Sequence, residues 1–193
     1  MKICFATNNP NKLREIQEIL GQRFVVVSLK EIGCLEELPE TTGTIEGNSM
    51  QKAAYVHERY QIPVFADDTG LEVEALGGEP GVDTAFYAGP DRDAHKNMTK
   101  VLAGLASEDN RKARFRTVIS FLDGNIKEQF EGIVEGEISE AIVGEGGFGY
   151  DPIFRPEGLP QTFAELSREA KNKISHRGRA IEKLVKFLQH KAN

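Results

Sequence analysis

The feature that most constrains this chain is an apolar run that ends in two neighbouring carboxylates. Residues 62–66 are followed directly by Asp67-Asp68-Thr69-Gly70. The run predicts a buried strand, and we expect it to stop at the two aspartates and to deliver their side chains to the edge of a sheet. Two adjacent aspartates that are dry and ionised need compensation by a metal ion, a hydrogen-bond network or a shifted pKa. An Asx-type turn opening a hairpin into residues 71–75 is the alternative, and these residues alone slightly favour it.

Composition excludes several classes of protein. A length of 193 residues, of which 39% are hydrophobic, predicts one ordered domain with an ample core. The formal charge of -6 argues against a nucleic-acid partner, which requires a basic face. No apolar run approaches the roughly 20 residues of a membrane span, so we expect no membrane partner. Cys4 and Cys34 lack metal-ligand spacing, and with no secretory leader they predict reduced thiols in a cytoplasmic protein.

A polar loop between a strand and a helix is the first candidate binding site. Residues 2–6 predict a strand, and apolar residues at 13, 16, 19 and 20 predict a helix. Asn9 suits the N-cap and Pro10 the first helical position, so free backbone N–H groups would point into the loop. Thr7, Asn8, Asn11 and Lys12 complete an anion cradle without the glycines of a P-loop. An ordinary capped helix with a solvated lysine explains this segment equally well.

The middle of the chain predicts further strands and helices. We expect a strand at residues 24–29, a loop at 35–47, and a helix opened by Asn48 and Gln51 as a variant capping box. Lys52 would then lie near a helix N-terminus, where a cation can join an anion site. Later periodicity predicts a helix over 94–105 and an antiparallel hairpin of strands 115–122 and 126–134.

Two dense stretches near the C-terminus are candidates for ligand contacts. Glycines alternate with Phe148 and Tyr150 between residues 146 and 151, which lets ring faces stand beside a close backbone and suits a flat heterocycle. Rings that pin the loop to the core are an equal alternative. Residues 171–179 are rich in Lys, Arg and His in an acidic chain, ahead of a final helix.

Taken together, these segments resemble the Ham1-like family of non-standard purine nucleoside triphosphate pyrophosphatases. Several short motifs carry the resemblance in order along nearly the whole chain: residues 6–12, 39–40 with 42–43, 66–71, 75–78, 80–82, 146–153 and 174–178. The resemblance implies an α/β fold with an elongated central mixed sheet flanked by helices and a nucleotide cleft between two lobes. It also implies a homodimer that uses Mg²⁺ to hydrolyse ITP, dITP or XTP to the monophosphate and pyrophosphate.

The resemblance also implies roles for individual residues. Asp68 would accept the proton of the attacking water with support from Asp67, and Glu40 with Asp68 would hold magnesium. The remaining residues would bind the nucleotide: Thr7, Asn8, Asn9, Pro10, Asn11, Lys12 and Lys52 at the phosphates, Thr69 at the substrate, Phe148, Gly149, Tyr150 and Asp151 at the base, and Lys171, His176 and Arg177 at the 6-keto oxygen.

Three positions depart from the family pattern. Thr41 stands where a second acid is common, so Glu40 is the candidate ligand of that pair. Phe86 replaces a frequent basic residue, and Ala170 replaces an acid that commonly precedes Lys171.

Two other functions remain open at this point. One is a Maf-like pyrophosphatase of related fold that acts on pyrimidine or modified nucleotides. The other is a nucleotide-binding protein that has lost turnover, against which intact Asp68, Lys12 and Lys52 speak.

Overall fold

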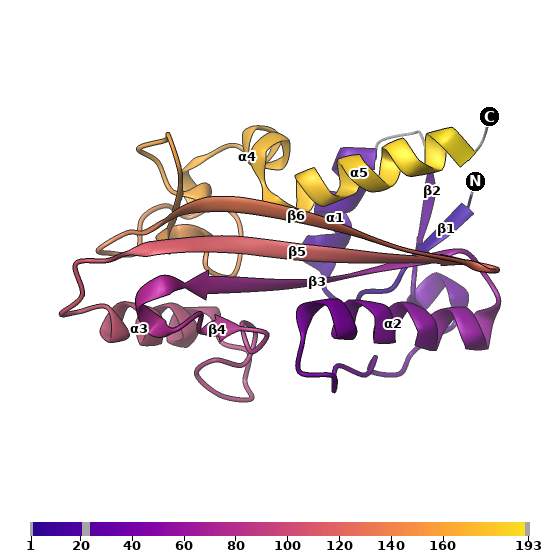
Figure 1. The fold of residues 1–193 in the computed structure, drawn as a ribbon, viewed down its shortest axis with the longest axis horizontal. Helices are drawn as coiled ribbons and strands as arrows, with labels where there is room; N and C mark the ends of the chain where they lie inside the picture. The colour runs from indigo at the N-terminus through magenta and orange to yellow at the C-terminus, as the bar shows by residue number, and fades with distance from the viewer. Residues whose placement is uncertain (1, 21–23, 192–193) are drawn as a thin grey trace. The chain divides into compact units, whose positions relative to one another are not determined.

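The architecture is a mixed β-sheet flanked by helices, as Figure 1 shows for the computed structural model. The structure describes residues 2–20 and 24–191. Strand β1 pairs in parallel with β2 and β3, whereas β4 pairs antiparallel with β3 and β7 with β6, in the order β2-β1-β3-β5-β6-β7. The strands are β1 (Lys2–Phe5), β2 (Val25–Ser28), β3 (Val64–Val73), β4 (Pro80–Gly81), β5 (Lys112–Asp123), β6 (Ile126–Ile138) and β7 (Phe154–Pro156). The helices are α1 (Pro10–Leu20), α2 (Ile45–Tyr60), α3 (Ala94–Gly104), α4 (Arg168–Ile174) and α5 (His176–Lys191).

These elements confirm the predicted α/β class, and the chain divides into two compact units. The first unit comprises Met1–Asp68, Thr117–Gly132 and Arg177–Asn193, and the second comprises Thr69–Arg116 and Ile133–His176. A single domain, an elongated shape and a nucleotide cleft between two lobes stay predictions. No helix in the described part of the chain combines the length and apolar composition that a membrane span requires.

In the first unit, the sheet is buried on both faces. Phe65 and Phe121 pack in a cluster with residues of α1 and α5, and Leu122 and Ala66 pack in another with residues of α2. Figure 1 shows α2 on one side of the strands and α1 with α5 on the other. Successive side chains of a strand point to opposite faces, so a strand covered on both sides is apolar without alternation.

Strand β3 corrects the prediction made for the two aspartates. The strand runs from Val64 to Val73 and passes through Asp67-Asp68-Thr69-Gly70 without ending, so neither the predicted sheet edge nor the alternative turn occurs there. Polar groups were expected to terminate the strand because carboxylates are rare in central strands. Charged side chains from neighbouring helices compensate them here.

The start of helix α2 also differs from the prediction. The helix begins at Ile45 after the N-cap Thr44, whose side chain accepts a hydrogen bond from the backbone N–H of Gly47. Asn48 and Gln51 therefore lie inside the helix, and Lys52 lies about two turns from its start. The prediction was wrong because Gly47 is a weak helix former that hides the first turn. By contrast, Asn9 is confirmed as a cap of α1, because its Oδ1 accepts hydrogen bonds from the N–H groups of Asn11 and Lys12.

The second unit has its own aromatic core. Phe115, Phe154 and Phe163 pack there with the α3 residues Met98 and Val101. The predicted hairpin is confirmed, because β5 and β6 are neighbours joined by Gly124 and Asn125, although both strands extend beyond the predicted bounds.

Both cysteines are free and buried, as the sequence predicted for reduced thiols. Burial raises the pKa of the Cys4 thiol to about 12, which keeps it protonated and unreactive at neutral pH.

Gly136 generates a stability prediction for the second unit. A Cβ at Gly136 would lie 2.2 Å from the carbonyl oxygen of Arg155, on the paired strand β7. Backbone cannot yield as a side chain can, so Gly136→Ala should lower the free energy of unfolding by about 1–3 kcal/mol in urea denaturation. Lys127→Ala, an exposed position on β6, is the control and should change it by less than about 0.5 kcal/mol. Equal effects of the two substitutions would contradict the close approach.

Candidate functional site

Strand β3 places its two neighbouring aspartates on opposite faces of the sheet. Asp67 shares the face of Phe65, which packs with α1 and α5, and Asp68 shares the face of Ala66, which packs with α2. Each carboxylate therefore meets cations from different helices. This arrangement separates the environments of two groups that are adjacent in sequence.

Asp67 lies in a buried charge network with residues of α1 and α5. Its Oδ2 is 3.0 Å from the Nζ of Lys12 and 3.2 Å from the Nε of Arg177. The Nη1 of Arg177 donates to Glu15, also on α1. Asp67 is 1% exposed and Arg177 2%, so these charges interact away from bulk water. Buried charges persist only when they are paired in this way.

The network keeps Asp67 ionised. Burial alone would raise the pKa of Asp67, but the Lys12 and Arg177 charges outweigh it and hold the pKa well below its usual range. Burial lowers the pKa of Lys12, although Asp67 opposes that effect. A lysine with a lowered pKa can lose its proton more easily, so its charge depends on the carboxylate beside it.

Asp68 lies in a second cluster, with Lys52 and Glu40. The Nζ of Lys52 is 3.7 Å from Asp68 Oδ1 and 2.5 Å from Glu40 Oε1. Burial raises the pKa of Asp68 although Lys52 opposes it, and Glu40 adds to the rise. Burial alone would lower the pKa of Lys52, but Asp68 and Glu40 hold it above its usual value. A carboxylate with a raised pKa is a better proton acceptor, so Asp68 is the candidate general base of the pair.

The carboxylates of the second cluster suit a hard cation. Carboxylate oxygens are the ligands that Mg²⁺ takes, and Mg²⁺ commonly uses one or two of them together with waters and substrate phosphates. Glu40 and Asp68 supply two such groups beside one ammonium. Among residues 2–20 and 24–191, no group of three His, Cys, Asp or Glu is placed to hold a metal ion. These two carboxylates would fit a magnesium ion whose remaining ligands are waters and phosphate oxygens. They do not form a closed protein cage.

The predicted anion cradle is shaped by its own side chains. The backbone N–H of Asn9 donates to Thr7 Oγ1, and Asn9 Oδ1 accepts from the N–H groups of Asn11 and Lys12. These three N–H groups therefore have internal acceptors, and the Lys12 ammonium points to Asp67. Phosphate binding by Thr7, Asn8, Asn9, Pro10, Asn11 and Lys12 stays a prediction.

In the second unit, an ion pair fixes the glycine-rich loop. Asp151 Oδ2 is 2.7 Å from the Nζ of Lys171 and accepts a 2.8 Å hydrogen bond from the N–H of Phe148. Gly147 has a φ of +69°, and a Cβ there would lie 2.1 Å from Asp151 Oδ2. The loop thus needs glycine at this position, and its predicted role in base binding remains untested.

The predicted aromatic and basic contacts differ in burial. Tyr150 is a buried core residue whose hydroxyl donates to the carbonyl oxygen of Thr84, whereas Phe148 is half-buried with Lys171 Nζ 4.8 Å from its ring centroid. His176 is buried and stacks on Phe115 at 4.6 Å. Gly149 has a φ of +63° in the same loop, and Thr69 is half-buried on β3.

The structure thus assembles the predicted residues as separate groups. Lys12, Asp67 and Arg177 meet in one cluster of the first unit, and Glu40, Lys52 and Asp68 meet in another. Phe148, Asp151 and Lys171 meet in the second unit. Contacts of Lys171, His176 and Arg177 with a base stay predictions.

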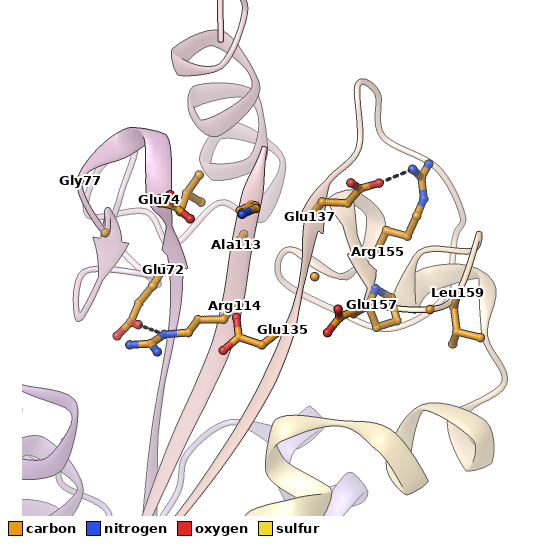
Figure 2. Close-up of a pocket in the computed structure, with 16 residues that line it drawn as sticks. Glu72, Glu74, Gly77, Ala113, Arg114, Glu135, Glu137, Arg155, Glu157 and Leu159 are labelled. Atoms are coloured by element: carbon orange, nitrogen blue, oxygen red, sulfur yellow. Dashed lines mark hydrogen bonds and ion pairs between the residues drawn. The ribbon is translucent and has the colours of Figure 1, made fainter. Parts of the chain in front are cut away.

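A pocket of about 830 Å³ in the second unit involves none of the predicted residues. Figure 2 shows Arg114 paired with Glu72 and Arg155 with Glu137 along its wall. Glu74, Glu135 and Glu157 also line it, so the wall is predominantly acidic. Such a wall does not suit a polyphosphate.

Sequence reasoning missed Glu15, Asn48 and Gln51. Glu15 follows Lys12 by three residues on α1, a spacing that places both on one side of a helix, but its partner Arg177 is 162 residues away. Asn48 and Gln51 were assigned to a helix cap. Their side chains instead hold the segment that carries Glu40.

The fold and the charged clusters define an α/β protein in which two neighbouring aspartates of a central strand pair with lysines from two helices. Comparison with known proteins identifies the family. The Ham1 family matches residues 3–187, so the chain belongs to the Ham1 family.

Similar proteins span nearly the whole chain. A protein from Porphyromonas gingivalis named dITP/XTP pyrophosphatase is 53% identical over 188 residues, covering 97% of both chains. A protein of the same name from Flavobacterium johnsoniae is 51% identical over 189 residues, covering 97% of this chain and 98% of the other. The Staphylococcus aureus Ham1 protein superposes with a TM-score of 0.90 at 38% identity, covering 99% of this chain and 100% of that structure.

The opposite pKa shifts of the two aspartates predict opposite effects on stability. The folded-state pKa of Asp67 lies below its unfolded value, so its ionised form stabilises the fold above the unfolded pKa of about 3.9, and this stability is lost as pH falls. Asp67→Asn leaves buried cations uncompensated and should lower the free energy of unfolding by about 3–5 kcal/mol at pH 7. The folded-state pKa of Asp68 is raised, so its charge costs stability at pH 7 and Asp68→Asn should be near neutral or stabilising.

Urea denaturation of both variants at pH 7 measures this contrast. A larger loss for Asp68→Asn than for Asp67→Asn would contradict the assignment of the two environments.

Proposed function

We propose that this protein hydrolyses non-standard purine nucleoside triphosphates, namely ITP, dITP and XTP, to the monophosphate and pyrophosphate. Membership of the Ham1 family and relatives named dITP/XTP pyrophosphatase support the proposal. The observation that carries it is the Asp68 cluster, where a carboxylate with a raised pKa stands beside Lys52. Such a reaction would clear deaminated purines from the nucleotide pool, which implies a cytoplasmic location.

Asp68 is the proton acceptor in the proposed mechanism. Cleavage of the bond between the α- and β-phosphates needs water activated at the α-phosphorus, and a carboxylate with a raised pKa takes a proton more readily than an ordinary one. Asp67 supports it by remaining ionised and holding Lys12 in place. The proposed hydrolysis requires no activated serine or cysteine, because positioning and electrostatic stabilisation dominate phosphoryl transfer.

Lys12 and Lys52 supply positive charge for the phosphates. Lys52 is held by two carboxylates and Lys12 by one, which keeps both ammonium groups oriented before a nucleotide arrives. Preorganised charge of this kind stabilises the developing negative charge without reorganisation during the reaction.

Glu40 and Asp68 would hold the magnesium ion. When bound, the ion neutralises phosphate charge and polarises the reacting phosphoryl group. Both carboxylates contact the Lys52 ammonium.

The base is the third part of the proposal. From the family resemblance, we assign the 6-keto oxygen to donors from Lys171, His176 and Arg177, and the ring faces to Phe148 and Tyr150. Arg177 and Tyr150 are buried in this structure, so this assignment requires them to become accessible to the base. A donor facing an amino group leaves two donors opposed, so ATP would be disfavoured. A homodimer is also part of the proposal by resemblance to the family.

The primary test of the proposed function is product analysis with a nucleotide panel. ITP, XTP, dITP, GTP, ATP, dTTP and UTP are incubated with the protein, with magnesium or with chelator, and pyrophosphate and orthophosphate are quantified. The expected result is magnesium-dependent pyrophosphate from ITP, dITP and XTP with little from ATP, because the 6-keto oxygen accepts from the assigned donors.

Other outcomes identify the alternatives. Orthophosphate as first product would place the cut at the terminal phosphate and contradict the proposal. A preference for dTTP and UTP would indicate the Maf-like activity, and no product with any nucleotide would favour a binding protein.

Asp68→Asn tests the proton acceptor. The variant should lose roughly 10²–10⁴-fold in kcat on ITP, because an amide cannot accept the proton, while nucleotide binding by calorimetry persists. Asp109→Asn, an exposed aspartate, is the matched control and should keep the wild-type rate. Near-wild-type turnover of Asp68→Asn would remove Asp68 from the mechanism.

A further inference from the structure

Glu40, a candidate metal ligand, lies on a segment without helix or strand. Residues 34–41 form neither helix nor strand, and α2 begins only at Ile45. The side chain of Glu40 is 34% exposed, yet it reaches the Nζ of the buried Lys52. An exposed carboxylate on an irregular segment loses conformational freedom when it is fixed, so other contacts must hold the segment in place.

The amide of Gln51 makes two hydrogen bonds with the residue after Glu40. Its Oε1 accepts from the backbone N–H of Thr41 at 2.9 Å, and its Nε2 donates to Thr41 Oγ1 at 2.8 Å. Both ends of one side-chain amide therefore bind one residue. Two bonds from a planar group fix orientation as well as distance, which a single bond does not.

Asn48 holds the following residue in a similar way. Its Oδ1 accepts from the backbone N–H of Thr42 at 3.1 Å and from Thr42 Oγ1 at 2.9 Å. Asn48 is 4% exposed, so its position is set by the packing of α2. Thr41 and Thr42 are thus both bound to side chains of the helix that carries Lys52.

Helix geometry connects these bonds to the Asp68 cluster. Asn48 precedes Gln51 by three residues and Lys52 by four, so its side chain neighbours each of them on the surface of α2. The helix places the Lys52 ammonium between Glu40 and Asp68, and the same helix fixes the backbone beside Glu40.

We propose that Gln51, assisted by Asn48, is a positioning residue that fixes the Glu40 carboxylate against Lys52 and so maintains the Asp68 cluster. Its consequence for catalysis rests on the proposed function, but the placement of Glu40 does not. The hydrogen bonds of the Gln51 side chain go to Thr41 and not to Lys52 or Asp68. It acts through the backbone and hydroxyl of Thr41.

The direct test is the reactivity of Lys52 toward acetic anhydride, measured by mass spectrometry on the nucleotide-free protein. An ammonium held by two carboxylates and buried from water reacts slowly, because acylation needs an accessible neutral amine. Gln51→Ala keeps a good helix former and removes both bonds to Thr41. It should raise the acetylation rate of Lys52 several-fold relative to the exposed Lys127 in the same molecule.

Three further variants make the result specific. Gln17→Ala removes an exposed glutamine from α1 and should leave the Lys52 rate unchanged. Gln51→Glu can accept from both the N–H and the hydroxyl of Thr41, so it should restore the wild-type rate. Thr41→Val keeps the backbone N–H but lacks the hydroxyl, and an intermediate rate is expected. If the acetylation rate of Lys52 in Gln51→Ala equals that in Gln17→Ala, the proposal is overturned.

Kinetics with ITP then test the catalytic consequence. Gln51→Ala should lower kcat or raise the half-saturating magnesium concentration on the order of tenfold, because the Glu40 carboxylate that would hold the ion is no longer fixed. If wild-type protein releases no pyrophosphate, the proposed function fails while the labelling result still decides the placement of Glu40. Increased Lys52 labelling with unaltered kcat and magnesium dependence would overturn the catalytic part alone.

Discussion

The alternation of side chains along β3 is the constraint on which the candidate site depends. Because the strand continues through Asp67 and Asp68, the two carboxylates point to opposite faces and pair with cations from different helices. Asp67 faces Lys12 and Arg177, and Asp68 faces Lys52. One sequence pair thereby produces an ionised structural carboxylate and a carboxylate with a raised pKa.

The two charge networks connect the packing of the first unit to the candidate site. The Asp67 network ties β3 to α1 and α5, and Glu15 extends it by pairing with Arg177. The Asp68 cluster ties the same strand to α2 and, through Gln51 and Thr41, to the irregular segment that carries Glu40. Both networks contain buried charges that would destabilise the fold without their partners. The contacts that assemble the first unit therefore also position the charged groups of the candidate site.

The sequence predicted several elements from local chemistry, but it did not predict the tertiary partners of the charged side chains. Asn9 and Pro10 predicted the start of α1 from local chemistry, since a cap acts within one turn. The continuation of β3 could not be predicted, because the cations that allow carboxylates inside a strand come from Lys12 and Arg177, far along the chain. Tyr150 could not be distinguished from an exposed ring either, because its hydrogen bond to Thr84 depends on tertiary packing.

The most direct test of this account is the pH titration of the two carboxyl carbons by ¹³C NMR, with Asp67→Asn and Asp68→Asn used for assignment. The account predicts that Asp68 titrates above the ordinary aspartate pKa of about 3.9 and Asp67 below it, in one sample. A shared pKa, or the reverse order, would contradict the claim that the strand gives its two aspartates opposite environments.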